Sequence, residues 1–305
     1  MRKVLKWIGI VLGGLIGLIV VALVALIVYG AATYKPTLKD RPLAPITADT
    51  SPEGLARGEY LMQSVMGCTG ACHSPEGQPL IGMSEPIDFG PIQGVFASPN
   101  ITPDQETGIG GWTDAEIARA IREGVDEDGV SLIVMPSYNY HVLSDADVAA
   151  IVGYLRNLQP VSNEVPPLSV NAFGKAVVAL RLFGPPSVGE PITTAQSSPA
   201  PGTTEYGGYL VSIGACRDCH QANLAGGPLP FAEEGTPIAS NLTPAGELAG
   251  RSEADFMTAM RSGGTPSGRV LDQSMPWIEY GGMTDEDLSA IFMYLKSLAP
   301  AQPKD

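Results

Sequence analysis

Hydrophobic and polar positions divide the chain into a long apolar start and two similar mixed regions. From Trp7 to Tyr34 no residue is charged, and most positions are Leu, Ile, Val, Ala or Gly. A membrane-spanning helix needs about 20 such residues, whereas the apolar core of a cleaved signal peptide has roughly 7–15. The pattern therefore predicts an uncleaved transmembrane anchor over residues 1–34, with a cleaved signal peptide as the alternative.

Segments without apolar periodicity flank and separate the mixed regions. Residues 35–51 are rich in proline and are expected to be a tether that spaces the globular part from the bilayer. Residues 161–202 form a linker in which "NAFGKAVVALRLFG" predicts a short apolar helix. That helix could lie on a membrane, dock on a partner or pack against both domains, and we favour the last. Residues 300–305 are expected to be a tail.

The two mixed regions repeat one pattern. The blocks "ARGEYLMQSVMGCTGACH", "ASPNITPDQE" and "WTDAEIARAIREG" return in the same order as "EYGGYLVSIGACRDCH", "IASNLTPAGE" and "RSEADFMTAMRSG". Each copy then has a Met-Pro dipeptide and a closing helical stretch. Matching blocks in one order indicate a duplication, which predicts two domains over residues 52–160 and 203–299.

Each copy is predicted to be helical. Thr113 with Glu116, and Ser252 with Asp255, have the spacing of a capping box or its shorter analogue. The stretches between helices carry no convincing strand alternation, so the expected fold class is all-α. A domain of about 100 residues with so much loop has little apolar core of its own, and a large apolar cofactor would supply one. The closing helices have an apolar face at Val148, Ile151, Val152 and Leu155, and at Leu288, Ile291, Phe292 and Leu295.

The charge distribution bears on topology and partners. Arg2, Lys3 and Lys6 precede the apolar run, so the N-terminus is expected in the cytoplasm and the rest of the chain outside. The chain has 18 Lys and Arg against 32 Asp and Glu, a net charge of −14. Phosphates would be repelled, which excludes nucleic-acid binding. The acidity could attract a basic protein partner or merely keep an exported protein soluble.

The four cysteines stand in two pairs, and a histidine follows each pair. Cys216, Cys219 and His220 form the Cys-x-x-Cys-His pattern to which haem c is attached covalently, with the histidine as proximal iron ligand. A disulfide or a zinc pair is the alternative. Zinc would need two further ligands, and the chain has no spare cysteine and only three histidines.

The first copy carries a longer version of this pattern. Three residues separate Cys68 from Cys72, which precedes His73. Because the surrounding blocks match those of the second copy, we interpret the motif as an expanded haem site. The extra residue is expected to be looped out at Gly70, where glycine tolerates unusual backbone angles. A disulfide-closed site that has lost its haem is the alternative. The sequence thus predicts two covalently bound haem c groups.

Two methionines are candidates for the sixth iron ligand. Met135 and Met275 align, each precedes a proline, and each lies between the cysteine pair and the closing helix of its copy. Coordination by methionine and histidine is typical of electron-carrying cytochromes c, so each is predicted to bind the iron with the histidine of its own motif. Met283 competes in the second copy, but its counterpart in the first is Leu143.

The third histidine is not predicted to be a ligand. His141 aligns with Gly281, and Met135 already provides a ligand in that copy. We interpret His141 as a loop residue.

These motifs resemble those of a known group of proteins. The Asn-Ile-Thr-Pro-Asp stretch at 100–104, the Gly-Gly-Trp-Thr-Asp stretch at 110–114 and the Met-Pro before a Ser-Asp-x-Asp helix resemble the cytochrome c subunits of membrane-bound periplasmic alcohol and gluconate dehydrogenases. The resemblance implies a class I-like cytochrome c fold in each copy and electron transfer as the activity. Members of that family usually have three haems and a cleaved leader, whereas this chain offers two haem sites and a predicted anchor.

Together these expectations describe a membrane-anchored, periplasmic dihaem cytochrome c at the inner membrane. It would relay single electrons between a membrane respiratory complex or dehydrogenase and another redox protein, and would be part of an enzyme only as a subunit. One alternative is a dihaem peroxidase-like or other oxidising enzyme with one open haem site. A second is a scaffold with one lost haem that binds a basic partner.

Overall fold

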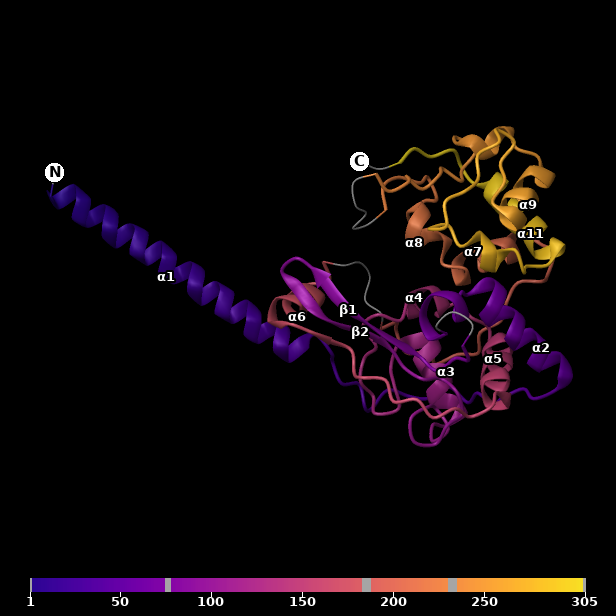
Figure 1. Cartoon of the computed structure of the whole chain (residues 1–305), viewed down its shortest axis with the longest axis horizontal. Coiled ribbons are helices and arrows are strands. Elements are labelled where there is room, and N and C mark those ends of the chain that lie inside the picture. Colours follow the sequence, from indigo (N-terminus) through magenta and orange to yellow (C-terminus); the bar gives the residue numbers. More distant parts are fainter. Residues whose placement is uncertain (1, 75–77, 183–187, 230–234, 304–305) are drawn as a thin grey trace.

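A single long helix projects from a globular part with two lobes (Figure 1). The computed structural model describes residues 2–74, 78–182, 188–229 and 235–303. Helix α1 (Arg2–Thr33) has a mean hydropathy of 3.1 over its most apolar window, none of which is buried. Within the described ranges it is the one helix long and apolar enough to cross a membrane.

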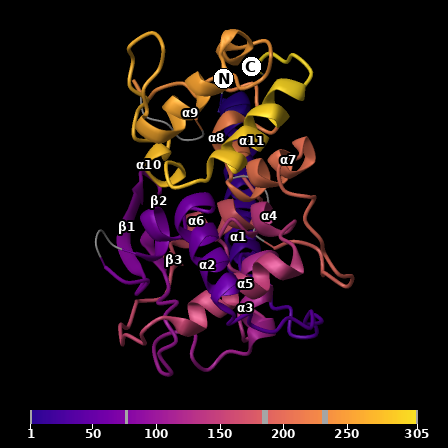
Figure 2. The ribbon, with the colours of Figure 1, turned by 90° about the vertical axis from the view of Figure 1, so that its right-hand side faces the viewer.

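The first sequence copy forms the lobe next to α1, and the second copy forms the other lobe. The two lobes remain side by side when the molecule is turned by 90° (Figure 2). The first lobe contains α2 (Pro52–Tyr60), the π-helical turns η1 (Leu61–Val65) and η2 (Thr69–His73), α3 (Asp114–Glu123), α4 (Ser137–Tyr140) and α5 (Asp145–Asn157). The second lobe contains α7 (Thr204–Ile213), α8 (Cys216–His220), the 3-10 turn η3 (Glu247–Gly250), α9 (Glu253–Ser262), α10 (Trp277–Tyr280) and α11 (Asp285–Ser297).

The helices begin at the predicted caps. Thr113 and Ser252 each form a capping box, at the starts of α3 and α9. Each hydroxyl accepts a hydrogen bond from the third backbone N–H of its helix at 3.2 Å. The capping pattern therefore predicted both helix starts correctly, because it depends only on residues three positions apart.

In each lobe the first and last helices cross at a glycine. A Cβ at Gly58 of α2 would stand 2.1 Å from the carbonyl oxygen of Ala150 in α5. A Cβ at Gly207 of α7 would stand 1.9 Å from the carbonyl oxygen of Ala290 in α11. Both neighbours are backbone atoms, which cannot rotate away. Only glycine allows these helices to approach so closely.

The all-α expectation is corrected by a small antiparallel sheet. Strands β1 (Met83–Phe89) and β2 (Ile92–Ser98) form a hairpin, and β3 (Ser169–Val170) pairs with β2. The hairpin turn has two residues, with Gly90 at a φ of 62°, as tight hairpin turns require. Most positions of β1 are exposed on both faces, so the strand lacks the apolar alternation by which a sequence indicates a strand.

Residues 35–51, expected to be a tether, lie along the first lobe. Arg41 forms an ion pair with Glu123 at 2.9 Å, and both side chains are largely buried. The backbone N–H of Asp49 donates to the carbonyl oxygen of Ala149 at 2.9 Å. These contacts hold the segment against the lobe instead of leaving it as a free spacer.

The predicted apolar helix of the linker is present as α6 (Ala172–Ala179), but it does not pack between the lobes. It packs against the end of α1 and against the sheet (Figure 1). Gly30 of α1 is buried there, and a Cβ at Gly30 would stand 2.6 Å from Cα of Ala176. The expectation that this helix contacts both domains is therefore wrong, because the exposed apolar end of α1 offers the nearer surface.

The glycine crossings generate a stability prediction. Gly207→Ala should lower the free energy of unfolding by about 1–3 kcal/mol, the usual cost of overpacking, because the new methyl group meets a backbone carbonyl. The measurement is urea unfolding followed by circular dichroism in one detergent. Gly250→Ala is the matched control, since a Cβ there meets nothing within 4 Å. Equal stability of the two variants would contradict the close crossing.

Candidate functional site

The two motif histidines have the same environment. His73 ends η2 and His220 ends α8, and their side chains are buried. Nδ1 of His73 lies 3.0 Å from the carbonyl oxygen of Pro99, and Nδ1 of His220 lies 2.8 Å from that of Ser240. A carbonyl can only accept, so each Nδ1 donates. Metal-binding histidines have this arrangement, because it fixes the ring and directs Nε2 towards the metal.

Burial sets the protonation of both motifs. It lowers the pKa of His73 and of His220, although the carbonyl contact opposes it in each case. It also raises the pKa of the Cys68 and Cys216 thiols to about 12. At neutral pH the imidazoles are therefore neutral and able to bind a metal, and the thiols keep their protons.

The four motif cysteines are free thiols. Cys68, Cys72, Cys216 and Cys219 form no disulfide. The disulfide-closed alternative for the first motif therefore has no support in this structure.

The longer first motif is wound as a π-helical turn, which corrects the expected loop. The backbone N–H of His73 donates to the carbonyl oxygen of Cys68 at 3.1 Å, five residues back, whereas the shorter second motif is the α-helical turn α8. A π-turn holds one more residue than an α-turn. Gly70 is not among the residues with positive φ, so glycine is not needed there for unusual backbone angles.

A second extra residue precedes the first motif and is also wound into a π-turn. Gly58 and Gly207 are equivalent because both mark the helix crossing. Tyr140 then donates to the carbonyl oxygen of Met66 at 3.1 Å, as Tyr280 does to that of Gly214 at 2.6 Å. The segment from Gly58 to Met66 is therefore one residue longer than the segment from Gly207 to Gly214, and η1 lies within the longer segment. Neither the π-turn nor these tyrosine contacts was predicted; comparing the spacing in the two copies would have revealed the extra residue.

The predicted methionine ligands have equivalent backbones. Met135 and Met275 are partly buried against the core. The prolines that follow them begin α4 and α10 with nearly equal angles, φ −80° and ψ 54° in one lobe and φ −77° and ψ 54° in the other. The shared conformation directs each short helix away from the methionine in the same way.

One cavity brings all the predicted site residues together. It has a volume of about 940 Å³ and is lined by both cysteine pairs, both motif histidines, Met135 and Met275. Most of its wall is apolar, including Trp112 in the first lobe and Phe256 in the second. Within the described chain, no hydrogen bond is made to Nε2 of either histidine. Thiols, imidazole nitrogens, thioether sulfurs and an apolar wall fit covalently bound haem.

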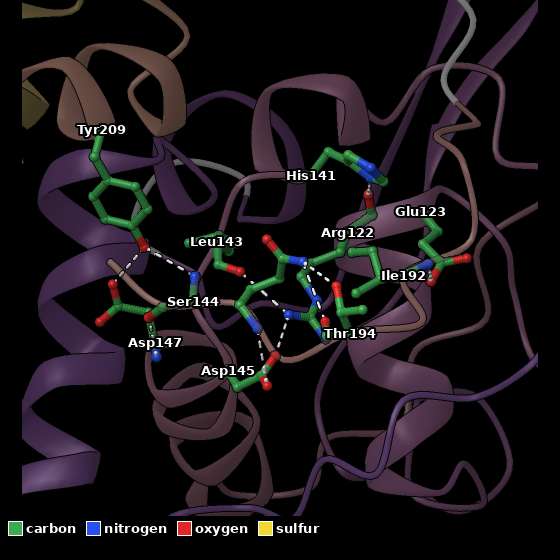
Figure 3. Close-up of polar contacts among 11 residues, drawn as sticks. Arg122, Glu123, His141, Leu143, Ser144, Asp145, Asp147, Ile192, Thr194 and Tyr209 are labelled. Carbon is green, nitrogen blue, oxygen red and sulfur yellow. Dashed lines mark hydrogen bonds and ion pairs between the residues drawn. The ribbon is translucent and has the colours of Figure 1, made fainter. Parts of the chain in front are cut away.

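Two other candidates from the sequence occupy different places. His141 does not line the cavity; its Nδ1 lies 3.0 Å from the carbonyl oxygen of Arg122 (Figure 3), in agreement with a loop role. Met283 is buried and does border the cavity. Met283 therefore lies next to the second site. Its counterpart in the first copy, Leu143, has no group that could bind iron.

The lobes hold each other through reciprocal tyrosine–aspartate contacts. Tyr209 of the second lobe donates to Asp147 of the first at 2.5 Å (Figure 3), and Tyr60 of the first donates to Asp287 of the second at 2.6 Å. Each tyrosine oxygen also accepts the N–H of the residue that caps the partner helix, Ser144 at 3.3 Å and Thr284 at 3.2 Å. The equivalent residues exchange partners, as in a dimer with two-fold symmetry.

Each motif also contacts the other lobe. Asp218, inside the second motif, accepts hydrogen bonds from Tyr138 at 3.1 Å and Asn139 at 2.8 Å, both on α4. Glu279 on α10 approaches the first motif, where a Cβ at Gly70 would stand 2.3 Å from its Oε1. The short helix after each methionine therefore contacts the opposite motif, which links the two sites mechanically.

Comparison with known proteins identifies similar chains. Residues 53–155 match the family described as "Cytochrome C oxidase, cbb3-type, subunit III". The chain is 29% identical to the fructose dehydrogenase cytochrome subunit of Gluconobacter japonicus, over 86% of this chain and 56% of the relative. It is 31% identical to the gluconate 2-dehydrogenase cytochrome c subunit of Pantoea cypripedii, over 79% of this chain and 59% of the relative.

A third relative is covered more fully. The chain is 30% identical to a diheme cytochrome c-type protein of Cereibacter sphaeroides, over 79% of this chain and 84% of the relative. By contrast, it spans little more than half the length of the dehydrogenase subunits.

The reciprocal contacts generate a prediction. Tyr209→Phe should lower the free energy of unfolding by roughly 2 kcal/mol, because a buried hydrogen bond to a carboxylate is lost. Tyr154→Phe is the control, since its hydroxyl only accepts an exposed bond from Gln63, and should change stability by about 0.5 kcal/mol or less. Denaturant unfolding of both variants is the measurement; equal values would show that the contact does not hold the lobes.

Proposed function

The chain belongs to the c-type cytochromes, and on that premise we propose that it is a membrane-anchored dihaem electron carrier on the periplasmic side of the inner membrane. It relays single electrons between a membrane respiratory complex or dehydrogenase and another redox protein. The observation that carries this proposal is the pair of buried histidines. Each donates a hydrogen bond from Nδ1 to a backbone carbonyl. Both line the same cavity, together with the two equivalent methionines.

The proposal divides the chain into an anchor over residues 1–34 and two tandem cytochrome c domains over 52–160 and 203–299. One haem c is attached through Cys68 and Cys72, with His73 and Met135 as iron ligands. The other is attached through Cys216 and Cys219, with His220 and Met275 as iron ligands.

The residues of the chain keep each site ready for electron transfer. Bound haem supplies the one-electron chemistry of its iron. The carbonyls of Pro99 and Ser240 orient the histidine rings, and a rigid ligand set changes little between oxidation states. Apolar side chains such as Trp112 and Phe256 exclude water from the cavity. Two equivalent methionines support a carrier over an enzyme with one open iron site.

The partner is proposed by analogy and by charge. Relatives are named as cytochrome subunits of fructose, alcohol and gluconate dehydrogenases, which supports a dehydrogenase as electron donor. The net charge of −14 supports a partner surface that is basic, because opposite charges accelerate encounter.

The proposal predicts two haems per chain. The pyridine haemochrome assay on the purified full-length protein should give two covalently bound haems, and the ferric protein should show the near-infrared band of methionine-bound iron. One haem per chain would contradict the assignment of Cys68 and Cys72, and a high-spin resting haem would favour the enzyme with an open site.

The axial assignment predicts the effect of one substitution. Met275→Leu should remove about half of the near-infrared methionine band and lower one of the two reduction potentials, because methionine coordination raises the potential. Met283→Leu is the matched control, a buried methionine on the same cavity, and should keep the full band. A band lost in Met283→Leu and kept in Met275→Leu would reverse the assignment.

A further inference from the structure

Exposed apolar side chains gather beside the end of α1. Phe89 ends β1, Phe173 lies in α6, and Leu180 and Leu182 follow α6; their exposed fractions are 68%, 48%, 45% and 63%. We call these four residues the apolar collar. The hairpin turn and α6 lie next to each other beside the last turns of α1 (Figure 1).

The collar is joined to α1 by direct packing. Gly30 of α1 is buried against Ala176 of α6. Asn171 accepts the N–H of Gly174 at 2.9 Å, which caps α6, and its Nδ2 donates to the carbonyl oxygen of Pro91 in the hairpin turn at 2.9 Å. The end of α1, α6 and the hairpin turn are therefore held together as one unit.

The contact at Gly30 determines how deep the collar lies if α1 spans a bilayer. The uncharged run from Trp7 to Tyr34 is ~42 Å long at about 1.5 Å per residue, and the hydrocarbon core is about 30 Å thick. A centred run places Gly30 at the edge of the hydrocarbon. Tyr34 and Lys35, which follow, are residue types that favour the headgroup layer.

We propose that the apolar collar inserts into the interfacial layer of the phospholipid bilayer around α1, so that the first lobe rests on the membrane. The inference rests on the membrane anchor of the proposed function. Continuity favours lipid as the occupant, because the collar adjoins a helix surface that is itself exposed and apolar. Lys175, whose Nζ lies 4.9 Å from the Tyr34 ring centroid, and Arg181 supply cations at the level of the phosphates.

Photo-crosslinking to lipid tests the inference with the full-length chain. The substitutions Phe173→p-benzoyl-phenylalanine and Phe89→p-benzoyl-phenylalanine keep an aromatic side chain at each position. They also avoid cysteine labelling, which would react with the motif cysteines. Each variant is reconstituted in vesicles of phosphatidylethanolamine and phosphatidylglycerol that contain a tagged lipid, and is then irradiated. The same replacement at the exposed Leu15 of α1 reports on the anchor. The replacement at Glu53, an exposed residue of α2, gives the background, because helix α2 lies on the side of the first lobe away from α1 (Figure 1).

The outcomes separate the collar from the anchor. Lipid adducts at Phe89 and Phe173 severalfold above the Glu53 background, together with adducts at Leu15, would support the inference. Adducts at Leu15 alone would overturn the insertion of the collar and would support the membrane anchor. The collar would then be assigned to a protein partner. Background yield at Leu15 would overturn the anchor and the inference with it.

Discussion

The hydrogen bond from a buried histidine Nδ1 to a backbone carbonyl organises each lobe. In both lobes the residue after that carbonyl is an asparagine, Asn100 or Asn241, whose side chain donates to the chain beyond the closing helix. The acceptors are the carbonyl oxygens of Val161 and Ala301, each at 2.8 Å. The cysteine motif, the central loop and the closing helix therefore meet at one point. The ring of the proposed iron ligand is oriented by this backbone framework, so little reorganisation is needed when a cofactor binds.

The second constraint is the way in which the lobes exchange contacts. The pairs Tyr60–Asp287 and Tyr209–Asp147 join equivalent residues in opposite directions, and Asp218 joins the second motif to the helix after Met135. A shift of one lobe would break contacts on both sides of the interface. The common cavity therefore depends on the interface as much as on either lobe, and the proposed relay between two haems requires such a fixed arrangement.

The position of the first lobe relative to α1 follows from packing along the linker segments. Arg41 and Asp49 hold residues 35–51 against the lobe, and α6 holds the end of α1. The lobe therefore has little freedom to move away from the helix. With α1 in a bilayer, the first lobe would be held at the membrane surface through the contacts of α6 with α1, and the second lobe lies beside the first (Figures 1 and 2).

The sequence by itself determined the features that depend on neighbouring residues: the long apolar helix, the capped helices, the duplicated cysteine motifs and the paired methionines. Only the tertiary structure decided the rest. Strand β1 is exposed on both faces and so has no apolar alternation that would indicate a strand. An extra residue can loop out or widen a helical turn, and the folded chain has the wider turn at Thr69–His73. Tyr60 and Asp287 are far apart in the chain, and their contact exists because the lobes pack with two-fold symmetry. Such distant contacts depend on three-dimensional packing, which local residue patterns do not encode.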